Sequence, residues 1–370
     1  MALRKRSLLP IGIHLNLDAV HIVQMEQVDG SVSLVSSASK DLRPEGSVLA
    51  EADGSRRSVR EIPEEVREVQ HRRVREFIRA ECSGNGFRGK QAVISMPTED
   101  LVIQHVRMAP MQPEELVAAL PWELQGKLPF DPKQAVIRHI VAGAISEDNQ
   151  TKQDVIVLAV ARAAVEKQVT AVEKLGLDVV GVGVEPCAMS YPYVFAAERA
   201  GPRPDGPASL MLVYVGTLAT HAAIVRGEET RFVKGIPLGL KDVAGALAKE
   251  LKVGYDEALN TMTSWRDEAT ISAEAVAAYN RLQSYLTHFV EEVESCMRYY
   301  ASLARGAKVD RIAFLGSGAR HRALVQVLGA HLSVPGEVGH PMGVVGLEGA
   351  GGPTEPELAV AAGLSLFGAQ

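Results

Sequence analysis

The chain has 370 residues, of which 46% are hydrophobic and 23% are charged, and its formal net charge is −6. This composition is typical of a globular protein with about two domains, and the mildly acidic balance argues against a general nucleic-acid binder. The three cysteines, Cys82, Cys187 and Cys296, stand far apart, so they predict neither a zinc site nor a disulfide framework and suit a reducing compartment. Polar residues interrupt the apolar stretch after the basic start, so we expect a cytoplasmic protein without a signal peptide or a membrane span.

The first half begins with a predicted β-meander. Apolar residues alternate over 11–17, the apolar run resumes at Val20, and Asp29-Gly30 predicts a second turn. A loop over 40–60 is followed by a helix that begins near Pro63, because proline and acidic residues favour the first helical turn. The residues expected on its buried stripe are Val66, Val69, Val74, Phe77 and Ile78.

The block 90–177 is predicted to be a compact α/β insertion. Its expected elements are strands over 91–96 and 101–106, a helix from 112 to about 125, strands over 136–142 and 154–161, and a helix over 164–175. A returning strand over 177–184 and a helix over 185–199, interrupted by Pro192, complete the first half.

A linker rich in proline and glycine, 200–207, separates the two halves. After it the opening pattern recurs, with strands expected over 210–215, 220–225 and 229–236. The remaining expected elements are helices over 242–252, 273–303, 320–332 and 357–366 and a buried strand over 311–315. We therefore predict two domains, 1–200 and 208–370, with the insertion at about 90–177.

Several motifs carry a family resemblance. They are Ala92-Val-Ile-Ser-Met-Pro97, the Pro-Met segment 107–123 with Leu128-Pro-Phe130, Leu175-Gly-Leu-Asp-Val-Val180 before Glu185-Pro186, Ile236-Pro-Leu-Gly239, Leu315-Gly-Ser-Gly318 and the closing helix 357–366. In this order they resemble the PilM family of type IV pilus assembly proteins, cytoplasmic relatives of FtsA and actin. The resemblance implies an α/β fold, namely the actin-like (ribonuclease H-like) two-domain fold with an inserted α/β subdomain.

The same resemblance implies where a nucleotide would bind. In the actin-like fold two hairpin turns hold the phosphates through backbone N–H groups, and acidic residues position Mg²⁺. The residues that would bind ATP or ADP here, if binding is retained, are Gly12, Asn16, Gly216, Thr217, Gly316, Ser317 and Gly318.

The hairpins depart from the family pattern. His14 stands where the first acid is expected, Leu17 replaces a small hydroxyl residue, and Tyr214 replaces the acid of the second hairpin. Mg²⁺ is therefore doubtful. Weak nucleotide binding, binding without metal and no binding stay open, and hydrolysis is not expected. Asp18 is the alternative acid, should the register be shifted by one residue.

Three further features have competing interpretations. Glu185 either orients a water molecule, as implied by its place in the fold, or is an acid at a helix N-terminus. His14 and His21 could share a metal with Asp18, although surface histidines are commoner, and no metal site is assigned. The arginines of the helix from 67 to 79 alternate with glutamates, which favours a solvated face over a membrane or partner surface.

The favoured function is a cytoplasmic adaptor of type IV pilus biogenesis. The resemblance implies that it binds the N-terminal tail of a PilN-like inner-membrane protein, in a groove formed by the insertion and the first meander, and contacts other pilus components. Membrane association would come only through such partners, and a homo-oligomer is left open. The alternatives are a Mg-ATP-dependent ATPase, an actin-like filament or sugar kinase, and a component of a type II secretion-like system. The end of the chain at Gln370 without a membrane span favours the free-standing PilM type.

Overall fold

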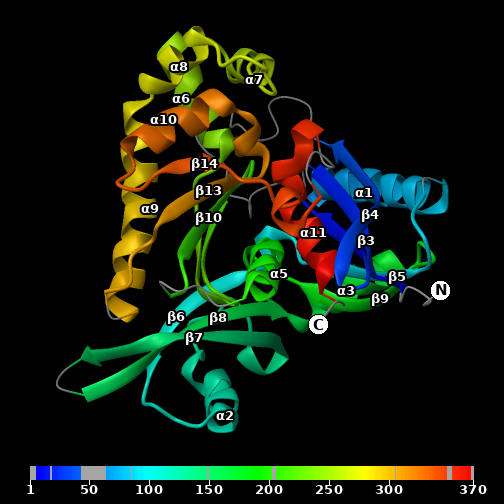
Figure 1. Cartoon of the computed structure of the whole chain (residues 1–370), viewed down its shortest axis with the longest axis vertical. Coiled ribbons are helices and arrows are strands. Elements are labelled where there is room, and N and C mark those ends of the chain that lie inside the picture. Colours follow the sequence, from blue (N-terminus) through cyan, green and yellow to red (C-terminus); the bar gives the residue numbers. More distant parts are fainter. Residues whose placement is uncertain are drawn as a thin grey trace.

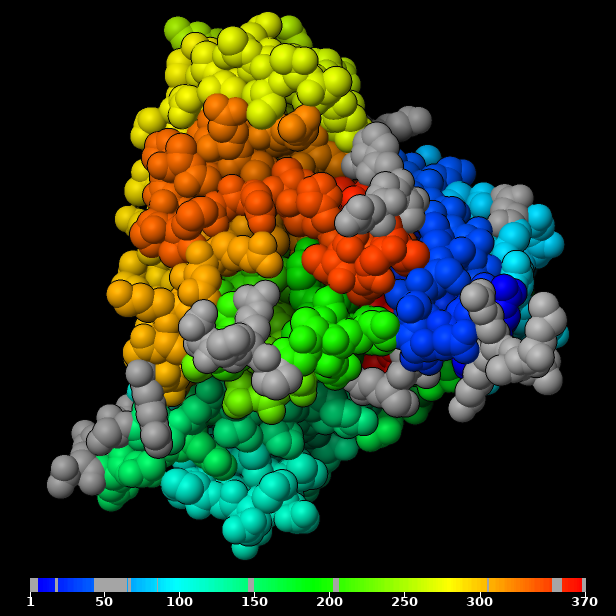
Figure 2. All heavy atoms as spheres, viewed as in Figure 1, coloured from blue at the N-terminus to red at the C-terminus, as the bar shows by residue number. Residues whose placement is uncertain are grey.

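The computed structural model describes residues 6–16, 19–42, 64–84, 86–147, 150–201, 206–304, 306–347 and 352–367. Three sheets and the helices around them form two halves, here called the first half (residues 6–201) and the second half (206–367), with a third sheet inserted into the first half (Figure 1). In the space-filling view the third sheet lies at one end of the molecule and the helical region around residues 255–280 lies at the other (Figure 2).

The first sheet has the order β1-β3-β2-β5-β9, with β4 paired to β3. Its strands are β1 (Arg6–Leu8), β2 (Ile11–Leu15), β3 (Ala19–Val28), β4 (Ser31–Asp41), β5 (Gln91–Ser95) and β9 (Asp178–Gly183). Every residue of β2 is buried, because helices cover both faces of the sheet. Two of them, α1 (Glu64–Gly84) and α3 (Arg162–Glu173), pack on one face, and α11 (Ala359–Leu366) packs on the other.

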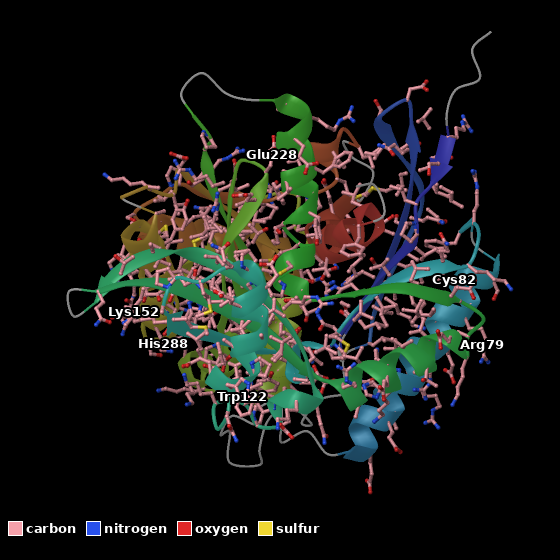
Figure 3. All side chains as sticks on the ribbon, turned by 90° about the horizontal axis from the view of Figure 1, so that it is seen from below. Arg79, Cys82, Trp122, Lys152, Glu228 and His288 are labelled. Atoms are coloured by element: carbon pink, nitrogen blue, oxygen red, sulfur yellow. The ribbon has the colours of Figure 1, made fainter. Side chains whose placement is uncertain are left out.

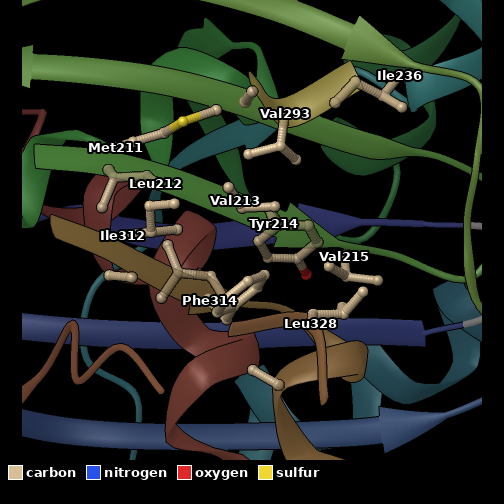
Figure 4. Packing of buried hydrophobic residues seen from close by; sticks show 14 of the residues in the cluster. Met211, Leu212, Val213, Tyr214, Val215, Ile236, Val293, Ile312, Phe314 and Leu328 are labelled. Atoms are coloured by element: carbon tan, nitrogen blue, oxygen red, sulfur yellow. The ribbon is translucent and has the colours of Figure 1, made fainter. Parts of the chain in front are cut away.

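The second sheet has the order β12-β11-β10-β13-β14. Its strands are β10 (Ser209–Val215), β11 (Thr220–Arg226), β12 (Glu229–Ile236), β13 (Arg311–Leu315) and β14 (Gly336–Val338). The helices of this half are α6 (Leu240–Leu251), α7 (Tyr255–Ser264), α8 (Ala273–Asn280), α9 (Gln283–Leu303) and α10 (Arg322–His331). Figure 4 shows part of this core, where β10 and β13 pair in parallel and Leu212 and Phe314 are fully buried.

The third sheet is antiparallel, in the order β6-β8-β7. It consists of β6 (Val102–Met108), β7 (Ala135–Glu147) and β8 (Gln150–Ala161), with α2 (Pro113–Glu123) on its outer face. The other face packs against the second half. There the hydroxyl of Tyr299 donates to the buried Asp154 carboxylate (2.8 Å), and a Cβ on Gly143 would lie 2.7 Å from the carbonyl oxygen of Leu303.

The first half ends with two short helices. They are α4 (Glu185–Ala188) and α5 (Tyr191–Ala200). The predicted interruption at Pro192 is confirmed in position, because Pro192 stands in the first turn of α5, where its missing N–H costs nothing.

Most predicted elements are present within a few residues. β1 and β14 were not predicted, and the other differences concern the insertion, the helices over 255–303 and the buried stripe of α1. β5 and β9 pair inside the first sheet, so the separately packed part of the insertion is 102–161. The expected helix over 273–303 is broken at Leu282, and α7 has no predicted counterpart because few of its side chains, Ala258 and Met262, are buried. On α1 the prediction for Val69 was wrong: it is exposed, and Gln70 is buried with its amide donating to the carbonyl of Leu42 (2.7 Å).

Candidate functional site in the cleft between the two halves

The hairpins β2–β3 and β10–β11 have the same geometry, at positions that differ by 200 residues. The N–H of Asn16 donates to the carbonyl of Ala19, and the N–H of Gly216 donates to the carbonyl of Ala219, both at 3.0 Å. His14 lies opposite His21 in the first hairpin, as Tyr214 lies opposite His221 in the second. Four aromatic or imidazole rings therefore occupy the same two hairpin positions in both halves.

These rings meet at the base of the cleft around Glu185, the first residue of α4. The His14 ring stacks on His21 with centroids 5.6 Å apart and contacts Tyr214 edge-on at 5.8 Å. His14 Nε2 lies 3.1 Å from one carboxylate oxygen of Glu185, and His221 Nδ1 bonds the other. One buried carboxylate thus joins a strand of the first half to a strand of the second.

Glu185 is buried, with only 3% of the residue exposed. Burial alone would raise the pKa of Glu185, but the charge of His221 and hydrogen bonds from His14 and His221 outweigh burial and hold its pKa well below the usual range. Glu185 is therefore an ionised carboxylate that bridges the two histidines. The Nδ1 of His14 is buried and has no hydrogen-bond partner among the described residues.

His21 is buried next to this cluster, and its Nδ1 lies 3.0 Å from the hydroxyl of Ser39. Burial lowers the pKa of His21 to about 4, with a smaller lowering from His14 and opposing contributions from Glu357 and Asp41. The imidazole is consequently neutral at physiological pH.

Two arginines of the second half cross the upper part of the cleft. Arg266, which follows α7, pairs with Asp41 at the end of β4 (2.9 Å) and with Glu357 (3.6 Å). Arg320 pairs with Glu357 (2.8 Å) and with Asp267. We call Asp41, Arg266, Asp267, Arg320 and Glu357 the arginine clamp; it ties the first half to the second.

The space left beneath the clamp is about 230 Å³. Ordinary small-molecule pockets measure roughly 300–1,000 Å³, so in this closed arrangement the cleft is smaller than a usual ligand site. The cavity is lined by Ala19, His21, Ser39, Asp41, Thr217, Leu240, Arg266, Ser317, Arg320 and Glu357.

The sequence profile described as type IV pilus assembly protein PilM matches residues 56–367. The chain belongs to this PilM family.

Solved structures agree on the fold. The PilM-PilN type IV pilus biogenesis complex matches this PilM-family chain with a TM-score of 0.71 and 20% identity, covering 98% of both chains. The ethanolamine utilization protein EutJ from Carboxydothermus hydrogenoformans matches with a TM-score of 0.50 and 14% identity, covering 97% of this chain and 89% of that one. The predicted actin-like two-domain fold is confirmed. A search among curated protein sequences finds no match to this chain.

The nucleotide residues expected from the PilM resemblance lie in different environments. Thr217 and Ser317 line the cavity, and the amide of Asn16 points to Glu185 at 3.5 Å. Gly12 faces α11 instead: a Cβ there would lie 2.0 Å from the carbonyl oxygen of Ala361. Helix packing is enough to require glycine at this position.

The other three expected glycines surround β10. A Cβ on Gly316 would meet the ring of Tyr214 at 2.9 Å, and one on Gly318 would meet Val215 at 2.5 Å. Gly316 also has a positive φ of 77°, which favours glycine. A Cβ on Gly216 would lie 2.9 Å from the carbonyl of Ala219. Close approach within the protein explains all three, so their presence is no independent sign of a phosphate.

Several functional expectations depend on residues near the first hairpin tip. Leu17 and Asp18 lie outside the described residues, so the predicted crowding by Leu17 and the alternative acid Asp18 stay predictions. Within the part of the chain that the structure describes, no group of three or more His, Cys, Asp or Glu residues is arranged to hold a metal ion. Nor is any described helix both long and apolar enough to cross a membrane.

Sequence reasoning missed His221, Arg266 and Arg320. The repeat of the hairpin pattern could have found His221, because it is the counterpart of His21 200 residues earlier. The two arginines carry no such signal, since their partners come from β4 and from the segment before α11.

Proposed function

We propose that this PilM-family chain is an adaptor of type IV pilus assembly that binds the N-terminal cytoplasmic tail of a PilN-like inner-membrane protein and does not turn over ATP. The family match supports the pilus role. The PilM-PilN complex among its structural neighbours supports a partner of this kind. The observation that carries the tail-binding role is an open strand edge beside a cavity at the junction of the insertion and the first half.

That edge belongs to β7. In the described sheet β7 pairs with β8 alone, so its outer edge is available for an added strand. A cavity of about 500 Å³ lies beside its first residues, Ala135–His139, and is also lined by Val117 of α2 and Arg162 of α3. An extended peptide gains affinity from main-chain hydrogen bonds along such an edge and specificity from adjacent pockets.

Loss of turnover is supported by the cleft. His14 and Tyr214 fill the positions where the resemblance expects acids, and Glu185 is bonded to two histidines. A hard cation such as Mg²⁺ prefers carboxylate oxygens, and an imidazole and a phenol stand here in place of the two expected carboxylates. The arginine clamp adds a nucleotide-independent link between the halves.

The first experiment titrates a synthetic peptide of the PilN-like tail while tryptophan fluorescence is recorded. Of the two tryptophans, Trp122 is 69% exposed and Trp265 is 7% exposed. Lys133, which lines the cavity, lies 5.3 Å from the centre of the Trp122 ring. We expect a saturable change that is lost in Trp122→Phe while calorimetry still detects binding.

A matched pair of variants locates the binding surface. Val117 lines the cavity and is 58% exposed; Val180 on β9 is 53% exposed and lines none of the cavities described here. Val117→Glu should weaken the peptide by tenfold or more, about 1.4 kcal/mol, and Val180→Glu should not. Equal effects of the two variants would reject this groove, and no peptide binding to the wild type would reject the tail-binding role.

The second experiment is a calorimetric titration with ATP, with and without Mg²⁺. We expect no saturable binding up to ~1 mM, which corresponds to an affinity weaker than roughly −4 kcal/mol. Binding that requires Mg²⁺, with phosphate release that is lost in Asp18→Asn, would overturn the proposal in favour of an ATPase.

A further inference from the structure

A second groove lies between α1 and α3. Its volume is about 770 Å³, and its walls are Arg72, Arg75, Glu76 and Arg79 of α1 and Ala163, Glu166, Lys167, Thr170, Ala171, Lys174 and Leu175 at and beyond α3. We call it the basic groove. Figure 3 shows Arg79 at the edge of the molecule, on the side where α1 and α3 lie together.

The basic groove concentrates positive charge on an acidic protein. Of the residues that line the groove, five are cations and two are acids, whereas the whole chain has a net charge of −6. Arg72, Arg75 and Arg79 follow each other at helical spacings of three and four residues, which places them on one face of α1. Lys167 and Lys174 are seven residues apart, which likewise places them on one face of α3.

These cations are exposed and have no ion-pair partner among the described residues. A solvated helix face, the interpretation favoured by the sequence, usually pairs its charges along the helix. Here Glu76 lies four residues from Arg72 and three from Arg79, yet neither pair is formed. The like charges of two helices instead converge on one groove, where they repel each other until an anion is bound.

We propose that the basic groove binds a short acidic segment of a partner protein. A membrane surface fits less well, because interfacial helices present large apolar side chains beside their cations, and no exposed large apolar residue of the described chain lines this groove. A concave site with arginines on the α1 side and lysines on the α3 side suits an extended peptide, whose acids can form paired hydrogen bonds with the guanidinium groups.

The dimensions set the length of the segment. The cations of α1 span seven residues, or about 10 Å of helix, and the lining of α3 spans about 18 Å. An extended chain advances about 3.3 Å per residue, so the groove accommodates roughly three to five residues. Two or three acids in such a segment would nearly balance the net charge of +3 that five cations and two acids give the groove.

The test measures fluorescence anisotropy of a labelled octaglutamate on the full chain, at about 0.15 M ionic strength, where charges are screened beyond ~8 Å. The variant is Arg75→Glu with Lys167→Glu. The control is Arg298→Glu with Lys308→Glu, two exposed cations outside the groove with the same change in net charge. Because one exposed ion pair changes affinity by up to about fivefold, we expect at least a tenfold weakening for the groove variant and at most a twofold weakening for the control.

Equal weakening by both variants would mean general charge attraction and would overturn the proposal. So would binding of phosphatidylglycerol vesicles, but not of octaglutamate, with loss of the vesicle binding in the groove variant. Absence of octaglutamate binding would overturn it as well.

Arg162 lines the cavity beside β7 and Ala163 lines the basic groove, so the two sites adjoin. Val117→Glu should leave octaglutamate binding unchanged, which separates this proposal from tail binding.

Discussion

Two sets of arginines in this chain have opposite surroundings. In the arginine clamp, Arg266 and Arg320 have side chains that are 12% and 11% exposed and are bonded to acids of the same molecule. In the basic groove, Arg72, Arg75 and Arg79 are exposed, and no ion pair of the described chain engages them.

The difference shows how the same residue type serves two purposes. A guanidinium that is withdrawn from water must be paired, because a lone buried charge is strongly destabilising. A guanidinium that stays in water contributes little to stability and remains available to another molecule. Changes in the cleft should therefore alter the free energy of unfolding, and changes in the basic groove should alter binding alone.

The largest effect is expected at Glu185. Glu185→Ala removes the acid that joins His14 to His221 and leaves two buried imidazoles without it. Loss of one partner of a buried charged group costs about 3–5 kcal/mol. Chemical denaturation followed by Trp265 fluorescence would measure this loss. A variant that unfolds at the wild-type midpoint would show that Glu185 does not stabilise the cleft.

A smaller effect is expected from the titration of His21. Its folded-state pKa of about 4 lies below the value of about 6.5 in an unfolded chain, so the unfolded chain takes up the proton first. The contribution of His21 is fully present above pH 6.5 and is lost as the pH falls toward 4. By linkage, the loss between pH 7 and pH 5 amounts to about 2 kcal/mol.

His21→Gln tests this because glutamine keeps a polar group near Ser39 but does not titrate. The free energy of unfolding of the variant should change less between pH 7 and pH 5 than that of the wild type. The comparison isolates His21, since other groups that titrate in this range are common to both proteins. Identical pH profiles would contradict the prediction.

Next comes the clamp itself. Arg266→Ala breaks the pairs to Asp41 and Glu357, of which Glu357 is buried and retains Arg320. Because one partner is buried and the other is partly exposed, we expect a loss of about 1–2 kcal/mol. Hydrogen exchange should also become faster at the end of β4. Unchanged exchange there would mean that the clamp does not hold the halves together.

The smallest change in stability is expected in the basic groove. Arg75→Glu with Lys167→Glu should shift the free energy of unfolding by no more than about 0.5 kcal/mol, as is usual for surface substitutions. A thermal melt of this variant beside Arg266→Ala tests the contrast directly. If the groove variant were the less stable of the two, the division between structural and available arginines would be wrong.

Local patterns predicted most of the elements. Alternating apolar residues in the two meanders located β2 and β3 and their counterparts β10 and β11, because successive side chains of a strand point to opposite faces of the sheet. Pairing over long distances was not predictable in this way. β5 pairs with β2 in the first sheet, which no local pattern indicates. On α1, Val69 was predicted in the core, but its neighbour Gln70 is buried instead, because the packing of a helix against other elements decides which of its sides is buried.

The candidate site was predicted only in part. The sequence places His14 and Tyr214 where the family resemblance leads us to expect acids, but it does not indicate that their rings converge on Glu185. That residue comes from a third element, α4, between the two hairpins in the chain. The arginine clamp joins residues 225 positions apart, from Asp41 to Arg266, and no spacing rule reaches so far.

The packing of α11 has a consequence for synthesis of the protein. Every residue of this helix is buried, and the hydroxyl of Ser365 donates to the carbonyl of Pro10 (2.9 Å) and accepts from the N–H of Met25 (3.1 Å), across 355 and 340 residues. The first sheet emerges early from the ribosome but keeps one apolar face bare until α11 has been made. Domains often fold in order as they are synthesised. In this chain the sheet that is made first needs the last helix to cover it, so it can be completed only after residue 366 has been synthesised.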